Sequence, residues 1–168
     1  MIKRYKNKVP AISPQACILE NVTIAGDVRI GDFSSIWYGS VLRGDICGIS
    51  VGNYTNIQDG SVVHVGNTSA RIGNYVTVGH NVIIHGCTVG DYTLIGMGSI
   101  IMDEAEIGDH VIVGAGTLIT RRKKIPPYSM VYGNPARIVR SLTDTEVKYL
   151  KEGAMEYVDL ATEYKKDM

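Results

Sequence analysis

Histidine is the side chain that most often binds metals and transfers protons near neutral pH, and this chain has four of them. They are His64, His80, His85 and His110. His64 and His85 are 21 residues apart, and Arg43 lies another 21 residues before His64. Three imidazoles that leave a fourth position open suit a catalytic Zn²⁺ ion, and Fe²⁺ or Co²⁺ would also accept them. Whether such a set forms depends on the elements that carry these residues.

An aliphatic residue recurs every six positions through most of the chain, with two steps of nine and one step of five. The seventeen positions are Ile18, Ile24, Ile30, Ile36, Leu42, Val51, Ile57, Val63, Ile72, Val78, Ile84, Val89, Ile95, Ile101, Ile107, Val113 and Ile119. Because six is an even number, all of these side chains point to the same side of an extended chain. Glycine follows the aliphatic residue at eight of the positions, which predicts very short strands separated by corners.

The composition also indicates a β protein. Ile and Val together number 38 while Leu numbers 7, and β-branched side chains fit pleated surfaces. The six-residue pattern, over roughly residues 11–140, resembles the hexapeptide-repeat family. That resemblance implies a mainly β fold, a single-stranded left-handed parallel β-helix in the shape of a triangular prism, in which three six-residue segments form one coil. We expect this domain to span residues 1–140.

A helix is predicted after the β-helix. Thr143 and Glu146 have the spacing of a capping box, and the apolar residues that follow are three or four positions apart. We expect a helix over about 144–165, within a C-terminal segment, 141–168, that packs on the β-helix.

Charge and cysteine content exclude several classes of protein. Lys and Arg total 17, as do Asp and Glu, so the net charge is zero and we expect no nucleic-acid or membrane partner. No apolar run reaches the roughly 18 residues of a membrane span, and no signal peptide is evident. Cys17, Cys47 and Cys87 lack CxxC spacing and are expected to be reduced thiols of a cytoplasmic protein.

The repeat positions the histidines relative to one another. The 21 residues between His64 and His85 include one step of nine, which is three residues longer than the usual step of six. Without these three extra residues the interval is 18, the length of one coil. We therefore expect His64 and His85 to stack on one face, with Arg43 below them. The same count places Asp59 beneath His80 on a neighbouring corner. His80 cannot easily reach the other two within one chain, but in a three-fold assembly it would meet those of a neighbour.

At these residues the resemblance becomes narrower, because three segments are similar to the γ-class carbonic anhydrases and, more closely, to their short YrdA-like members. The segments are SIWYGSVLRGD (35–45), NIQDGSVVH (56–64) and GHNVIIH (79–85). The resemblance implies that His64, His80 and His85 bind the metal, expected to be Zn²⁺, at a site shared between subunits of a homotrimer. The implied reaction is the reversible hydration of CO₂ to bicarbonate by a metal-bound hydroxide.

Five further residues match active-site positions of that family: Arg43, Asp45, Asn56, Gln58 and Asp59. The amides of Gln58 and Asn56 can orient a water molecule or a substrate oxygen. We expect Arg43, Asp45 and Asp59 to form ion pairs across the subunit boundary, where such pairs fix registry more often than they do chemistry.

Two features depart from the active members of the family. Ile46 stands where they have a glutamate directly after Arg-Gly-Asp, and the loop 65–71 is short and lacks a carboxylate to shuttle protons. Because fast hydration needs proton export, the sequence leaves open whether the activity is fast, weak or absent. Tyr157 and Tyr164, from the predicted helix, are candidates to line the site.

Two expectations concern residues outside this set. Trp37 is interpreted as packing at the trimer interface, and His110 as an outward surface residue. Two other functions stay open: a hexapeptide-repeat acyltransferase or CoA thioesterase, and a catalytically weak trimeric metal-binding scaffold. Acyltransferases of this type usually employ a single loop histidine as base, which favours the metal interpretation of three spaced histidines.

Overall fold

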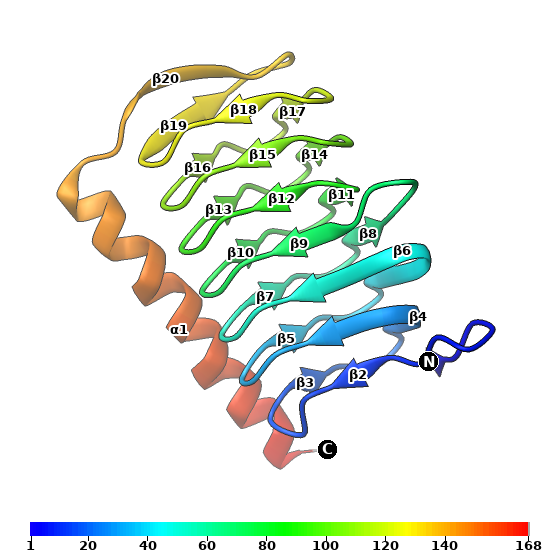
Figure 1. Ribbon diagram of the computed structural model, residues 1–168. Coiled ribbons are helices and arrows are strands. Elements are labelled where there is room, and N and C mark those ends of the chain that lie inside the picture. Colours follow the sequence, from blue (N-terminus) through cyan, green and yellow to red (C-terminus); the bar gives the residue numbers. More distant parts are fainter. Residues whose placement is uncertain (168) are drawn as a thin grey trace.

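The computed structural model describes residues 1–167, which form a three-sided prism of short strands with one long helix beside it (Figure 1). The chain winds through about 7 turns, and each turn contributes a strand to each side. The strands of successive turns pair in parallel, so the predicted left-handed parallel β-helix is confirmed. Residue 168, the last of the predicted C-terminal segment, lies outside the described residues.

The three sides of the prism differ in what covers them. The histidine face consists of β8 (Val62–His64), β11 (Ile83–His85), β14 (Ile100–Ile101) and β17 (Leu118–Ile119). The polar face consists of β9 (Ala70–Ile72), β12 (Thr88–Val89), β15 (Glu106–Ile107) and β18 (Lys124–Ile125). The helix-covered face consists of β3 (Cys17–Ile18), β5 (Ser35–Ile36), β7 (Asn56–Ile57), β10 (Thr77–Val78), β13 (Leu94–Ile95), β16 (Ile112–Val113), β19 (Ser129–Tyr132) and β20 (Arg137–Ser141).

Two long strands, β4 (Thr23–Ile30) and β6 (Val41–Val51), bend around a corner and belong to both the histidine and the polar face. Gly26 has a φ of +85°, and a Cβ at this position would collide with the carbonyl of Gly44. The two glycines therefore let the strands bend and stack closely. The N-terminal strands β1 (Ile2–Lys3) and β2 (Ala11–Ile12) pair with β4.

The aliphatic repeat forms the core of the prism. Of the seventeen repeat positions, all but the half-buried Ile18 are at most 4% exposed. Burying an isoleucine or valine fully stabilises the fold by roughly 1.5–3 kcal/mol per side chain, so these inward side chains of the three faces account for much of the hydrophobic stabilisation.

A ladder of aromatic rings runs along the corner between the polar and helix-covered faces. Its members are Phe33, Tyr54, Tyr75, Tyr92, His110 and Tyr128, stacked with ring centroids 4.7–5.2 Å apart. Each has a φ between +52° and +57°, so each occupies the same left-handed position in its turn. His110 lies at an outer corner, as expected of a surface residue, but its ring is half-buried because it stacks between Tyr92 and Tyr128.

The helix α1 (Asp144–Lys166) lies along the helix-covered face and runs back toward the N-terminal turns (Figure 1). It begins with the predicted capping box, in which Thr143 Oγ1 accepts from the Glu146 N–H and the Glu146 carboxylate accepts from the Thr143 N–H. Between residues 1 and 167, no helix is both long and apolar enough to cross a membrane. The domain boundary at residue 140 stays a prediction; the last strand ends at Ser141.

Trp37 does not lie on a free face of the chain. It is 4% exposed and contacts Tyr157 and Tyr164 of α1 edge-on, with ring centroids 5.5 and 5.3 Å away. Its Nε1–H donates to Ser35 Oγ at 2.9 Å. The expectation that Trp37 packs at a subunit interface was therefore wrong, because the C-terminal helix of the same chain already covers it.

Candidate functional site

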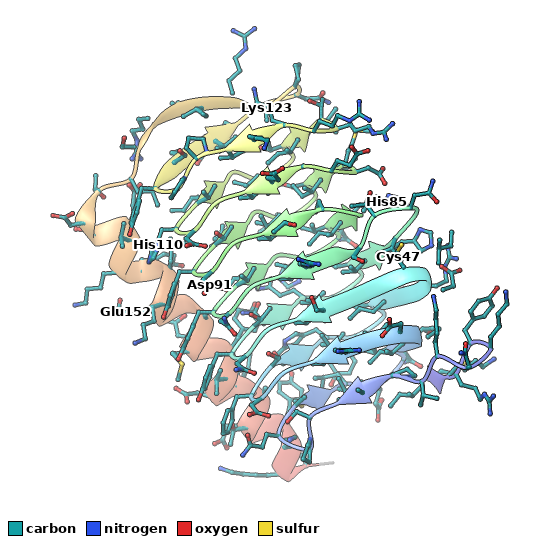
Figure 2. The ribbon with its side chains drawn as sticks, viewed as in Figure 1. Cys47, His85, Asp91, His110, Lys123 and Glu152 are labelled. Atoms are coloured by element: carbon teal, nitrogen blue, oxygen red, sulfur yellow. The ribbon has the colours of Figure 1, made fainter. Side chains whose placement is uncertain are left out.

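His64 and His85 occupy the last positions of two neighbouring strands, β8 and β11. The strands pair in register, so His64 lies directly opposite His85, and Arg43 of β6 lies opposite His64 on the other side. The expected stacking of these three residues is confirmed. The imidazoles approach closely, with His64 Nδ1 3.1 Å from His85 Nε2. Figure 2 shows His85 on the side of the prism away from α1.

An aspartate contacts each end of this histidine pair. Asp45 Oδ1 lies 3.2 Å from His64 Nε2, and Asp103 Oδ1 lies 2.9 Å from His85 Nδ1. Arg43 donates to the other oxygen of Asp45. Burial by itself would raise the pKa of the Asp45 carboxyl, but its hydrogen bonds with Arg43 and His64 outweigh burial and lower that pKa. Asp45 is therefore a carboxylate at neutral pH.

The two carboxylates determine which ring nitrogens carry protons. A carboxylate only accepts hydrogen bonds, so the contacts with Asp45 and Asp103 assign His64 Nε2 and His85 Nδ1 as the donors. In the neutral rings, the lone pairs of His64 Nδ1 and His85 Nε2 then face each other. Two nitrogens bound at about 2.0–2.1 Å to a tetrahedral zinc ion are roughly 3.3 Å apart, close to the separation observed here. The pair therefore has the geometry of two metal ligands.

His80 lies at the opposite edge of the histidine face, in the corner between β10 and β11. Its Nδ1 is 2.9 Å from Asp59 Oδ2, so the expected stacking of Asp59 against His80 is confirmed. By the same argument this carboxylate leaves the lone pair on His80 Nε2. Over the described range, no three His, Cys, Asp or Glu side chains of one chain converge as a metal site. The sequence predicted that His80 would not easily meet the other two histidines within one chain, and the structure places it in a different corner; the shared site itself stays a prediction.

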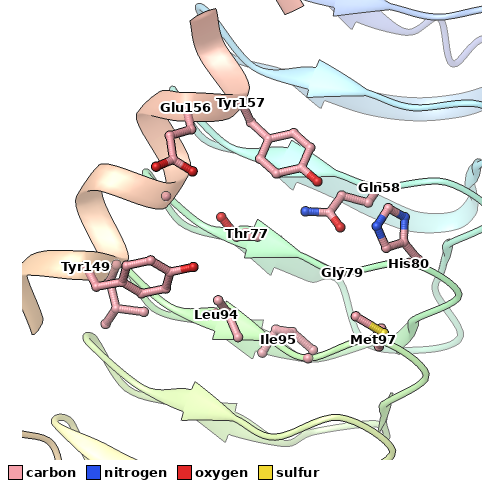
Figure 3. A pocket seen from close by; sticks show the side chains of 13 residues that line it. Gln58, Thr77, Gly79, His80, Leu94, Ile95, Met97, Tyr149, Glu156 and Tyr157 are labelled. Atoms are coloured by element: carbon pink, nitrogen blue, oxygen red, sulfur yellow. The ribbon is translucent and has the colours of Figure 1, made fainter. Parts of the chain in front are cut away.

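Asn56 and Gln58 are the buried amides on the helix-covered side of this corner. Gln58 Nε2 donates to Asn56 Oδ1 at 3.0 Å, and Asn56 Nδ2 donates to Thr77 Oγ1 at 3.0 Å. These bonds fix the orientation of the Gln58 amide, which is 5% exposed. The sequence predicted both residues as orienting groups, and the structure places Gln58 beside His80 (Figure 3).

A cavity of about 260 Å³ lies between this corner and α1. Gln58 and His80 form one end, Leu94 and Ile95 form an apolar floor, and Tyr157 projects from the helix toward Gln58 (Figure 3). Burial raises the pKa of the Tyr157 hydroxyl above its usual value, and the Asp59 charge adds to this effect.

Glu156 is the one carboxylate among the residues that line this cavity, and no motif or spacing in the sequence indicated it. Tyr164 does not line the cavity. It packs against Trp37 and Tyr38 instead.

The ion pairs differ in part from those expected. Arg43 and Asp45 pair within one chain, whereas Asp59 contacts His80 and no arginine in the described structure. Ile46 follows Asp45 as an exposed side chain, and Lys8 donates to the carbonyl oxygens of Asp45 and Ile46 at 3.1 and 2.7 Å. The N-terminal segment therefore holds the part of β6 that carries Asp45.

The cysteines take no part in the site. All three are free thiols, as predicted; Cys17 and Cys87 are buried and Cys47 is half-buried. Burial raises the pKa of the Cys87 thiol to about 12, so it is inert at neutral pH.

Comparison with known proteins gives matches along nearly the whole chain. The family model described as "Bacterial transferase hexapeptide (six repeats)" matches residues 86–121. The chain is 46% identical over 166 residues to a carbonic anhydrase of Geobacillus kaustophilus, with 98% of this chain and 91% of that protein covered. It is 38% identical to protein YrdA of Escherichia coli, covering 98% and 94%.

It is also 44% identical to the mitochondrial gamma carbonic anhydrase 1 of Arabidopsis thaliana, but spans only 59% of that protein's length. Among solved structures, a hexapeptide transferase family protein from Anaplasma phagocytophilum is 43% identical with a TM-score of 0.94, covering 97% of both chains.

Proposed function

This chain belongs to the γ-carbonic anhydrase family of hexapeptide-repeat proteins, and we propose that it interconverts CO₂ and bicarbonate at a metal site shared between subunits of a homotrimer. The observation that carries the proposal is the pair of facing nitrogens, His64 Nδ1 and His85 Nε2, with the lone pair of His80 Nε2 at the other edge of the same face. Enzymes named carbonic anhydrase are 44–46% identical to the chain.

These three nitrogens suit Zn²⁺, and Fe²⁺ or Co²⁺ as alternatives, because all are neutral imidazole donors with carboxylate partners behind them. When bound, the ion would lower the pKa of a coordinated water to about 7 and so supply the nucleophile for hydration. His64 and His85 of one subunit and His80 of its neighbour would hold the ion, and three protein donors would leave room on it for a reactant.

The outward side chains of the histidine face favour a trimer. They form a continuous aliphatic column across paired strands: Val41, Val62, Ile83, Ile100 and Leu118. The corresponding column on the polar face is Ser50, Arg71, Thr88, Glu106 and Lys124. Ile83 and Ile100 are 43% and 40% exposed in the single chain, and an apolar stripe of this kind marks an interaction surface. Its two edges carry the two parts of the metal site, as a three-fold assembly requires.

Gln58 and Asn56 orient the reactants in this proposal. The Gln58 amide uses one hydrogen to bind Asn56, so its oxygen and second hydrogen are available in the cavity that it shares with His80. A fixed amide can accept from a water molecule or donate to an oxygen of CO₂ or bicarbonate. The Arg43–Asp45 pair holds His64 from behind and so acts on orientation rather than on the reactants.

The decisive experiment measures CO₂ hydration by stopped flow with the zinc-loaded full-length protein, beside His80→Ala and His110→Ala. We expect hydration in the wild type and in His110→Ala, whose substituted ring lies in the aromatic ladder, and none above background in His80→Ala. A zinc-loaded wild type that hydrates CO₂ no faster than His80→Ala would contradict the proposal.

Acyl transfer from CoA is the second candidate, favoured by the transferase descriptions of the matching family model and of the Anaplasma phagocytophilum structure. CoA-thioester turnover measured with and without a chelator separates the two functions. Turnover that survives removal of the metal would favour acyl transfer, because a histidine base needs no ion.

A further inference from the structure

Asp103 lies directly above the histidine pair and has no counterpart among the residues that the sequence singled out. It begins the corner after β14, whose Ile100 and Ile101 pair with Ile83 and Ile84 of β11. Its Oδ1 atom is 2.9 Å from His85 Nδ1. The five-residue step shortens this coil to 17 residues, so the strand register places Met102 opposite His85 and Asp103 one position further along; the count that aligned the histidines does not lead to Asp103.

The surrounding backbone makes room for this carboxylate. A Cβ on Gly86, the residue after His85, would lie 2.9 Å from Asp103 Oδ1 and 3.1 Å from the Thr68 carbonyl oxygen. Gly86 also has a φ of +50°. The Asp103 carbonyl accepts from the Arg122 N–H at 3.0 Å, which anchors the main chain at this corner.

In residues 1–167, His85 is the one basic side chain that pairs with the carboxylate of Asp103. Its neighbour Glu104 pairs with Arg121 and Arg122, whereas Asp103 makes no ion pair with lysine or arginine in residues 1–167. Its side chain is 31% exposed, so the bond to His85 is partly shielded from water. A carboxylate in this position both orients the ring and selects which nitrogen carries the proton.

We propose that Asp103 is the positioning residue for His85: it holds the proton on Nδ1 and turns Nε2 toward His64 Nδ1. This inference deepens the proposed function and rests on it, because the role of a positioning residue is to prepare a metal ligand. Asp103 touches neither the reactants nor the ion; it acts through His85.

The test compares Asp103→Asn with the wild type in zinc affinity, by chelator competition, and in the ¹⁵N shifts of the His85 ring. Asparagine keeps the shape of the side chain, but its amide can donate as well as accept, so it no longer selects one tautomer. We expect zinc affinity to fall about 10- to 100-fold, and the ¹⁵N shifts to report a mixture of tautomers in the metal-free protein.

Glu104→Gln is the matched control, since it removes the adjacent charge without contacting a histidine, and its affinity should stay within about twofold of wild type. Asp103→Ala is the second variant, with a similar loss expected, and circular dichroism establishes that both Asp103 variants are folded. Unchanged zinc affinity and an unchanged His85 tautomer in folded Asp103→Asn would overturn the inference. Zinc binding by the wild type without CO₂ hydration would instead contradict the proposed function and leave the positioning role intact.

Discussion

His64 Nδ1 and His85 Nε2 face each other at 3.1 Å across adjacent turns of the β-helix, while His80 stands at the opposite edge of the same face. One chain therefore prepares two donors at one edge and one donor at the other. Nothing in the fold of a single chain can bring the edges together, since the strands between them form the rigid wall of the prism. In the proposed function, assembly of the subunits is therefore part of forming the active site.

Mixed trimers test this division of the site. We expect His80→Ala and His85→Ala each to be inactive, but hybrids formed from both to regain activity. In a random mixture, about a quarter of the sites would combine the intact His85 edge of one subunit with the intact His80 edge of its neighbour. The measurement is CO₂ hydration before and after the two variants are unfolded and refolded together. Hybrids that stay as inactive as their parents would argue against a shared site.

The aliphatic stripe of the histidine face predicts where assembly can be disrupted. Ile83→Arg places a charge in the middle of the stripe, and we expect it to give monomers because a buried unpaired charge is costly. Thr88→Arg introduces the same side chain at an outward position of the polar face and should leave the trimer intact. Analytical ultracentrifugation distinguishes the two variants. If Ile83→Arg sediments like Thr88→Arg, the interface lies elsewhere.

Proton export is the step for which the sequence offered no residue, because Ile46 and the loop 65–71 lack a carboxylate. Glu156 lines the cavity that contains His80. We expect Glu156→Gln to slow hydration about tenfold or more in dilute buffer, and imidazole buffer to restore the rate. Glu152, on the same helix, lines a different pocket with Tyr92 and His110, so Glu152→Gln serves as the control. A loss of rate that imidazole does not restore would point to a structural effect.

The capping box predicts a pH dependence of stability. Hydrogen bonds from Arg140 and from the Thr143 backbone lower the pKa of Glu146 to about 2, against 4.5 in the absence of these partners. A lowered pKa stabilises the fold above pH 4.5, and the stabilisation is lost as the pH falls toward 2. We expect the melting temperature of Glu146→Gln to be lower than that of the wild type at pH 7. Near pH 2 the two melting temperatures should be the same. Fluorescence of the single tryptophan, Trp37, reports the release of α1. Glu163→Gln, at the other end of α1, should show no such convergence.

Among the described residues, His110 is the member of the aromatic ladder whose side chain carries a polar atom that its surroundings do not satisfy. Within residues 1–167, Nδ1 of His110 is buried without a hydrogen-bond partner, whereas the neighbouring rungs are tyrosines. His110→Tyr removes the unsatisfied nitrogen and keeps the stacking, so we expect it to stabilise the protein by about 1 kcal/mol. His110→Ala should destabilise it by at least a similar amount through lost stacking. Denaturant unfolding measures both changes, and a destabilised His110→Tyr would show that the nitrogen is satisfied in solution.

The sequence alone determined the β-helix, since a six-residue period with an aliphatic residue at each repeat leaves only one side of the chain to bury. It also determined that His64 and His85 stack and that Asp59 lies against His80, because the six-residue period shows which residues occupy the same position in successive coils. The capping box and the helix followed from local patterns of hydrogen bonding and periodicity.

Tertiary structure decided what the period cannot measure, namely distances across the prism and the direction of the side chains. It placed Trp37 beneath α1 and His110 inside a stack, since contacts between a helix and a sheet face depend on how separate elements pack. It also showed that Asp45 contacts His64 and Asp103 contacts His85, because neither aspartate lies in register with its histidine and the direction of the side chains brings them together. The sequence therefore predicted that His64 and His85 align, and the folded chain showed which carboxylates contact their rings.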